Sequence, residues 1–391
     1  MKLLLLSMSS RRVVMGFLGV VRAIYFALLG FSPITIGLLL SFATLVSAFH
    51  HISFGVLSDR YGRKPFLLLG AVFATSRLVI FATTRNFWLI VLAQGLGALG
   101  EGAAPGQPVV SGYIADKVGL RERVSTFSTL AITNAIAASI GSAIAGLPQV
   151  FQNLLGLDLV SAHVPLFSIG IVFSALSFVL LLPIKDVPPA EEERAQEDRK
   201  MFTVKSWSVI LKFSLVRSTS GFGWGLIEPL LTLYFFIRFA VGSDVLGPVF
   251  AATRLVSIFT YLLIPFFIDK LGEIGTIIWS RLLTAVVTVA FAFTNWFPLS
   301  IVLLIIFRLL MMFSMPIRQS FATEIVDPDE TATAIGISNF ARMGVRSIAP
   351  TLAGYMFQAV SLSMPFLMGA TLLAVNGVLY HAYFRPAKKQ M

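Results

Sequence analysis

The stretch Gly55-Val-Leu-Ser-Asp-Arg-Tyr-Gly-Arg-Lys64 lies between two long apolar runs, and its residue types decide how the chain folds. Gly62 permits a tight turn between two helices, and Gly55 lets a neighbouring helix approach closely. Asp59 can meet the positive N-terminal end of another helix, and Arg63 can reach an acidic partner. The stretch therefore predicts a polar turn between membrane helices, with contacts that form and break.

The composition indicates a chain that is surrounded mostly by lipid. Its 391 residues are 57% hydrophobic and 13% charged, with a mean hydropathy of +0.86, whereas a soluble domain carries about 25% charged residues. Cysteine is absent, which excludes a disulfide framework and a thiolate metal site. The formal charge of +11 sits in short turns rather than in one patch, so nucleic acid is not an expected partner.

Apolar runs of about 20 residues, the length that crosses the hydrocarbon core, recur along the whole chain. Residues 1–10 are expected to be the approach to the first run, and the mixed-charge segment 185–205 is expected to be a solvated linker. The predicted fold class is an all-α membrane protein with 12 transmembrane helices in two pseudo-symmetric six-helix bundles, 1–184 and 207–391, joined by a cytoplasmic linker, 185–206. The expected spans are 12–31, 35–56, 65–84, 87–108, 124–147, 163–183, 207–239, 245–268, 273–293, 296–316, 331–358 and 364–384.

Basic residues in the turns between these spans fall almost entirely on one side. The opposite loops offer Arg85 and, near a span end, Arg238. The positive-inside rule then predicts a multi-pass protein of the cell membrane with both termini in the cytoplasm. The residues on the predicted cytoplasmic side are Arg11, Arg12, Arg60, Arg63, Lys64, Lys117, Arg121, Arg123, Lys270, Arg385, Lys388 and Lys389.

The two halves repeat each other with an offset of 210 residues. Asp59 and Gly62 are matched by Asp269 and Gly272, and Gly37 is matched by Gly247 at the same offset. Duplicated halves are typical of transporter folds, in which the substrate site lies near the membrane midplane where the halves meet.

The opening stretch, extended through Pro65-Phe66-Leu67, resembles the loop 2–3 signature of the major facilitator superfamily, with Ser58 in place of alanine. The resemblance implies the fold of that superfamily and secondary transport. Gly112-Tyr-Ile-Ala-Asp116 resembles the helix 4–5 loop of the same family, which implies that Asp116 is the acidic partner of Arg63. The predicted cytoplasmic latch comprises Gly55, Asp59, Gly62, Arg63, Asp116, Asp269 and Gly272.

Two departures weaken a drug/proton antiporter interpretation. Proton antiporters of the family carry an arginine three residues before a Gln-Gly pair in helix 4, but here Val91 precedes Gln94-Gly95. Drug exporters carry an internal Gly-Pro signature in helix 5, and the segment 131–146 lacks it.

Charged residues inside the spans carry the functional prediction. Ten of them facing lipid would cost about 25–35 kcal/mol, more than a typical net stability of about 5–15 kcal/mol. They must therefore line water, pair with one another, or extend to the interface. In the resembled family helices 1, 4, 7 and 10 line the central cavity, and the predicted cavity residues are Arg22, Tyr25, Glu101, Glu228, Arg308 and Arg342. Fixed salt bridges, such as Arg22 with Glu101, remain an alternative role.

The net charge of the residues inside the spans is positive, because there are eight arginines and only two glutamates. Arginine binds carboxylate and phosphate groups through two parallel hydrogen bonds. The expected substrate is therefore an organic anion, a carboxylate or a phosphorylated solute, held by Arg22, Arg308 and Arg342. Glu101 or Glu228 is the candidate to carry a coupled proton, since a carboxyl group removed from water holds its proton more readily.

Other functions remain open as alternatives. The first is a multidrug/proton antiporter, and the second is a membrane receptor or scaffold that does not transport. An enzyme is not expected: the sequence offers no catalytic residues, no nucleotide-binding glycine loop followed by Lys-Ser or Lys-Thr, no metal-ligand spacing and no cofactor motif. The expected partners are a small-molecule substrate, the lipid bilayer and a proton, and the expected state is a monomer.

Overall fold

The computed structural model describes residues 1–101, 108–186, 206–324 and 331–384, in which the secondary structure is helical with no strand. Nine of the helices in this part of the chain are long and apolar enough to span a membrane. The first half forms α1 (Lys2–Leu28), α2 (Pro33–Tyr61), α3 (Arg63–Thr83), α4 (Phe87–Glu101), α5 (Pro108–Lys117), α6 (Leu120–Ala143), α7 (Leu147–Leu155) and α8 (His163–Leu181). The second half forms α10 (Trp207–Ile227), α11 (Leu231–Phe239), α12 (Ser243–Phe259), α13 (Ile264–Phe293), α14 (Phe297–Glu324), α15 (Thr331–Ala359) and α16 (Met364–Phe384).

Every expected span overlaps one or two of these helices, but several ends differ. Helix α1 begins at Lys2, so the segment expected to approach the first span is itself helical. Helix α14 continues to Glu324, beyond the expected end at residue 316. Polar residues near these ends therefore lie within helices and pack against neighbours, which a hydropathy boundary does not reveal.

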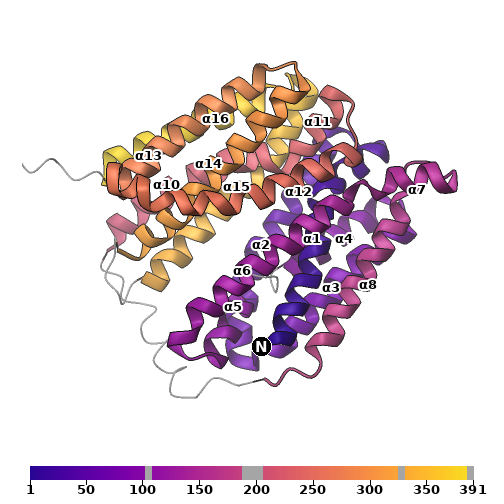
Figure 1. Cartoon of the computed structure of the whole chain (residues 1–391), viewed down its shortest axis with the longest axis horizontal. Coiled ribbons are helices and arrows are strands. Elements are labelled where there is room, and N and C mark those ends of the chain that lie inside the picture. Colours follow the sequence, from indigo (N-terminus) through magenta and orange to yellow (C-terminus); the bar gives the residue numbers. More distant parts are fainter. Residues whose placement is uncertain (102–107, 187–205, 325–330, 385–391) are drawn as a thin grey trace, which may run out of the picture. The chain divides into compact units, whose positions relative to one another are not determined.

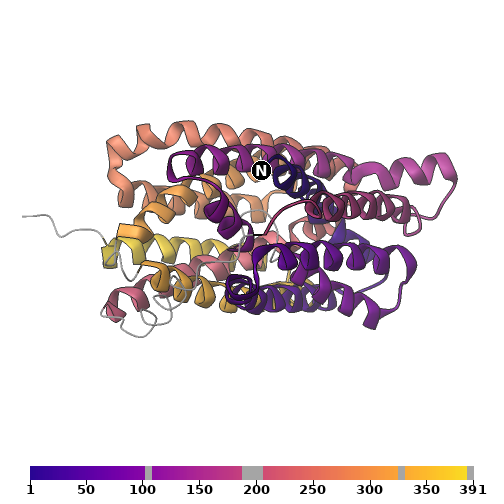
Figure 2. The ribbon, with the colours of Figure 1, turned by 90° about the horizontal axis from the view of Figure 1, so that it is seen from below.

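Helix contacts repeat between the two halves. In the first half α1 packs on α6 and α8, and α3 packs on α4 and α8. In the second half α10 packs on α15 and α16, and α13 packs on α14 and α16. Figures 1 and 2 show these second-half helices, pink for α10 and orange to yellow for the later ones, running beside one another. The pairing pattern reproduces the repeat that the matched glycines and aspartates predict.

The repeat extends to backbone conformation. Gly62 has φ +90° where α2 passes into α3, and Gly272 has φ +69° at a kink inside α13. Side chains other than glycine rarely adopt such angles. Both turns therefore require glycine at this position, as the tight-turn interpretation predicts.

Contacts group the chain into two compact units. Unit 1 contains Met1–Ser32, Phe42–Ala195 and Thr232–Leu255, and unit 2 contains Pro33–Ser41, Gln196–Leu231 and Val256–Met391. The first turns of α2 thus belong with second-half helices, while α11 and most of α12 belong with first-half helices. The division at 184 and 207 follows the order of the chain, and it remains a prediction.

Matched glycines explain why the start of α2 and most of α12 group with helices of the other half of the chain. In unit 2, a Cβ atom at Gly37 of α2 would overlap the Pro350 carbonyl of α15, and one at Gly354 would overlap the Pro33 carbonyl. In unit 1, a Cβ atom at Gly247 of α12 would lie 2.7 Å from the carbonyl oxygen of Ser142 on α6. Small residues let membrane helices approach to backbone contact. The repeated glycines Gly37 and Gly247 therefore build one such crossing in each unit.

Hydrogen bonds reinforce both crossings. Thr351 donates its backbone N–H and its hydroxyl to Ser41 Oγ, at 2.9 Å and 2.7 Å. Ser139 Oγ donates to the carbonyl oxygen of Ala251 at 2.9 Å. Polar contacts between membrane helices stabilise their association modestly, by about 0.6 kcal/mol each, so such a crossing can separate and form again.

Candidate functional site

An ion pair within unit 2 joins two of the predicted cavity residues. Arg308 Nη2 of α14 lies 2.6 Å from Glu228 Oε1, and the two side chains are 11% and 24% exposed. Beside the pair, the rings of Trp224 and Phe307 stack with centroids 5.9 Å apart and planes 11° apart. The structure therefore places Glu228 and Arg308 together, and the Glu228 carboxylate compensates the charge of Arg308.

Glu228 lies where the helix geometry changes. Helix α10 ends at Ile227, and Glu228–Leu230 forms the 3-10 turn η2 before α11 begins. Pro229 lacks a backbone N–H and cannot continue the regular hydrogen-bond ladder. Broken helices of this kind form binding sites in transporters.

The two carboxylate oxygens of Glu228 differ in their hydrogen bonding. Oε2 is buried and has no hydrogen-bond partner among the described residues, while Oε1 accepts from Arg308. A buried acceptor without a partner is costly, and a proton on Oε2 turns it into a donor. Oε2 therefore lacks the hydrogen bond that Oε1 has.

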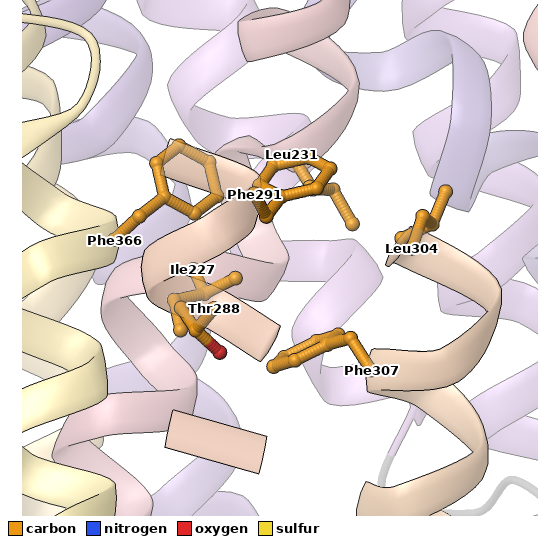
Figure 3. Close-up of a pocket in the computed structure, with 7 residues that line it drawn as sticks. All are labelled: Ile227, Leu231, Thr288, Phe291, Leu304, Phe307 and Phe366. Carbon is orange, nitrogen blue, oxygen red and sulfur yellow. The ribbon is translucent and has the colours of Figure 1, made fainter. Parts of the chain in front are cut away.

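A small apolar hollow lies next to this pair in unit 2 (Figure 3). Ile227 and Phe307, the neighbours of Glu228 and Arg308 in sequence, both line it, and it has room for about one water molecule. It is too small for an organic substrate. Its lining consists of Ile227, Leu231, Thr288, Phe291, Leu304, Phe307 and Phe366.

The predicted cavity residues in unit 1 differ in how far their side chains are buried. Tyr25 is 2% exposed; its hydroxyl donates to the Phe81 carbonyl at 3.3 Å, and its ring packs on those of His163 and Phe167. Its ring is therefore buried between α1, α3 and α8, and a cavity role for Tyr25 stays a prediction. Arg22 is half-buried, and the side chain of Glu101 lies outside the described residues, so their pairing remains a prediction.

Two other arginines of unit 1 are buried. Arg11 is expected from its position to anchor a cytoplasmic loop, but it is 3% exposed within α1 and donates to the carbonyl oxygen of Gly100. Arg77 is 2% exposed and packs against Gly97, where a larger residue would overlap its side chain. Both side chains therefore hold α1 and α3 against α4.

The latch residues occupy the turn between α2 and α3. Arg63 Nη1 donates to Ser58 Oγ at 2.9 Å, and its side chain covers Gly112 of α5 so closely that a Cβ atom there would overlap the guanidinium. Asp269 and Gly272 are exposed. The side chains of Asp59 and Asp116, and the surroundings of Gly55, lie outside the described residues, so the Arg63–Asp116 pair remains a prediction.

An acidic residue that the sequence prediction assigned to the linker occupies this turn. Asp186 Oδ1 accepts the backbone N–H groups of Arg63 at 3.0 Å and Lys64 at 3.2 Å. Gly62 has no side chain to cap α3, and a Cβ atom there would overlap the Asp186 carboxylate. Lys64 Nζ also donates to the Leu182 carbonyl at 2.7 Å. Asp186 thus caps α3 from a distant part of the chain.

We expect Asp186→Asn to lower the free energy of unfolding by about 1 kcal/mol, because the amide removes the negative charge from the positive end of α3. Thermal unfolding of the purified protein measures the effect. The control is Asp269→Asn, which makes the same charge change at an exposed position. An unchanged midpoint for Asp186→Asn, or an equal loss in the control, would contradict the capping role.

Comparison with known proteins places this chain in a family. The family model described as Major Facilitator Superfamily matches residues 3–350. The chain belongs to the major facilitator superfamily, whose members are multi-pass membrane transporters.

Individual relatives are distant. The quinolone resistance protein NorA of Staphylococcus aureus is 23% identical over 375 residues, covering 95% of this chain and 93% of that protein. Among solved structures, a bacterial homologue of the human lysosomal transporter Spinster matches with a TM-score of 0.77 and 16% identity over 97% of this chain and 95% of that one. The human organic anion transporter MFSD10 matches with a TM-score of 0.62 and 16% identity over 97% of this chain and 98% of that one. These structural likenesses confirm the fold.

Proposed function

We propose that this protein is a secondary active transporter that moves a small organic anion by alternating access and couples the movement to a proton at Glu228. The observation that supports the proposal is the Glu228–Arg308 pair, in which one carboxylate oxygen is bonded and the other is buried without a partner among the residues that the structure describes. Protonation at Oε2 neutralises the carboxylate, weakens its hold on Arg308 and lets the guanidinium bind a substrate anion instead.

The arginine content supports an anionic substrate. Arg308 changes partner in this scheme, and Arg22 on α1 supplies a second cation in the other half of the sequence. The description of MFSD10 as an organic anion transporter is consistent with this class. The substrate is a carboxylate or a phosphorylated solute. The protein acts as a monomer in the cell membrane, with both termini in the cytoplasm.

A multidrug/proton antiporter is the second candidate. Similarity to NorA, a quinolone resistance protein, over 95% of this chain favours it. The same Glu228 would carry the proton, but the substrate would be a lipophilic compound. A membrane receptor or scaffold without transport is the third possibility, and it predicts no flux at all.

Flux in proteoliposomes distinguishes these functions. With an imposed pH gradient, we expect uptake of organic anions, and we expect Arg22→Ala and Arg308→Ala each to raise the apparent KM about tenfold or more, because each loses a charge-assisted contact. Arg85→Ala, at an exposed loop, serves as the control. Unchanged KM values in both variants would contradict the anion clamp, and flux of lipophilic cations alone would favour the drug antiporter.

A further inference from the structure

Four arginines gather within unit 2, on four different helices. Arg217 is on α10, Arg281 on α13, Arg318 on α14 and Arg342 on α15. Arg217 lies ten residues after the start of α10, and Arg342 eleven residues after the start of α15. At 1.5 Å per residue, each is about 15 Å from the predicted cytoplasmic end of its helix.

The hydrogen-bond partners of two of these arginines are neutral. Arg217 donates to Ser338 Oγ at 3.2 Å and to Asn339 Oδ1 at 2.7 Å. Arg318 donates to the Ser314 carbonyl at 3.1 Å and to Ser220 Oγ at 3.4 Å. Hydroxyl and amide groups orient a guanidinium but do not neutralise its charge.

Arg281 and Arg342 show the same lack of compensation. Arg281 is fully buried and donates to Met311 Sδ at 2.8 Å and Ser314 Oγ at 3.1 Å. The Nε atom of Arg342 is buried and has no hydrogen-bond partner in the part of the chain that the structure describes. Among the side chains that the structure describes, no carboxylate pairs with any of the four.

The four charges also act on one another. Arg342 lies within electrostatic range of Arg217 and Arg318, and Arg318 lies within range of Arg281. The Tyr380 hydroxyl lies within range of Arg217, Arg281 and Arg318. Like charges held together repel each other, and screening by water is weak in a buried site. An anion bound among them would offset this repulsion.

The helices approach closely around this cluster because of a glycine motif. Gly221 and Gly225 stand one turn apart on α10, and a Cβ atom at Gly221 would lie 2.6 Å from Arg342 Cγ. Paired glycines at this spacing permit tight packing of membrane helices. The side chain of Arg342 is thereby held against α10, which carries Arg217.

We propose that Arg217, Arg318 and Arg342 form an oxyanion site that binds a carboxylate or phosphate group, and that the buried Arg281 adds a further positive charge beside this site. The first three side chains are half-buried, whereas Arg281 is enclosed. Identification of this site as a station for the transported solute rests on the proposed organic-anion transport. Glu228 directly follows the end of α10, eleven residues after Arg217. At 1.5 Å per residue the oxyanion site and the Glu228–Arg308 ion pair are about 16 Å apart along this helix.

Binding is tested on the purified full chain in nanodiscs. Replacing chloride by inorganic phosphate or acetate at constant ionic strength should raise the unfolding temperature of the wild type, because a ligand that binds only the folded state stabilises it. In Arg342→Gln, the oxyanion concentration that gives half of the full rise in unfolding temperature should increase about tenfold or more, because a charge-assisted hydrogen bond is lost. Arg342→Lys, which keeps the charge without the planar fork, should fall between the two. Arg85→Gln is the matched control for net charge.

The arms of the experiment identify the source of the anion. Stabilisation by phosphate or acetate that Arg342→Gln weakens assigns a solute site. Stabilisation only by phosphatidylglycerol in nanodiscs otherwise made of phosphatidylcholine, again weakened in Arg342→Gln, assigns a lipid phosphate at the same arginines. Equal responses in wild type and Arg342→Gln overturn the site, even where proteoliposome flux is intact. Absence of proton-driven anion flux in the wild type overturns the proposed function, whereas the oxyanion site still stands or falls on the binding measurement.

Discussion

Replacement of Glu228 by glutamine is expected to remove the pH dependence of transport and to reduce pH-driven accumulation at least tenfold. Glutamine keeps the shape of the side chain and still offers Oε1 to Arg308, whose Nη2 donates over 2.6 Å in the wild type. What it loses is the negative charge and the ability to take up a proton. Removing one partner of a buried ion pair outright costs about 3–5 kcal/mol, so the conservative substitution is preferred to alanine.

Two measurements separate coupling from folding. Initial uptake in proteoliposomes at several internal and external pH values gives the coupling, and exchange of substrate without a pH gradient reports on binding and movement. We expect exchange to persist in Glu228→Gln while accumulation disappears. In Arg308→Gln, the positively charged partner of Glu228 is lost, so the pH profile of accumulation should differ from that of the wild type. A wild-type pH profile in Glu228→Gln would show that the coupled proton binds elsewhere.

The features that follow from local sequence were predicted well. Apolar runs indicate membrane helices because their length and composition are local properties, and the family match and the helical structure confirm that fold. The repeat also follows from sequence, since Gly62 and Gly272 both adopt positive φ. Gly37 and Gly247 both lie at helix crossings, although their spacing alone did not say what they contact.

The site residues that sequence reasoning missed are those whose role depends on tertiary contacts. Arg318 lies past the point where hydropathy falls and so outside the expected tenth span, yet α14 carries it into the arginine cluster. Asp186 belongs by composition to a charged linker, and only folding brings it to the start of α3. Tyr25 stands on a predicted cavity helix, but the rotation of α1 turns it into the core. Helix membership can be derived from sequence, whereas the direction of each side chain requires the packed neighbours.

We expect a second large effect on transport from a disulfide that cross-links α2 to α15. Ser41→Cys combined with Thr351→Cys should form a disulfide on oxidation, because the two hydroxyl oxygens lie 2.7 Å apart. The chain has no cysteine of its own, so these would be its only thiols. Alternating access requires the halves of a transporter to move against each other. We therefore expect oxidation to stop nearly all transport and a reductant to restore it.

A second cysteine pair makes this result specific. Ser7 Oγ and Ser177 Oγ also lie 2.7 Å apart, but they join α1 to α8 within the first half of the chain. A disulfide from Ser7→Cys with Ser177→Cys ties together helices that move as one body, so oxidation should leave most of the transport rate. Gel mobility after thiol labelling measures cross-linking, and proteoliposome flux measures transport. Full flux through protein cross-linked at positions 41 and 351 would refute separation of α2 from α15 as a step of the cycle. Equal inhibition by both pairs would show that the first half itself must deform during transport, because the Ser7–Ser177 disulfide restrains nothing else.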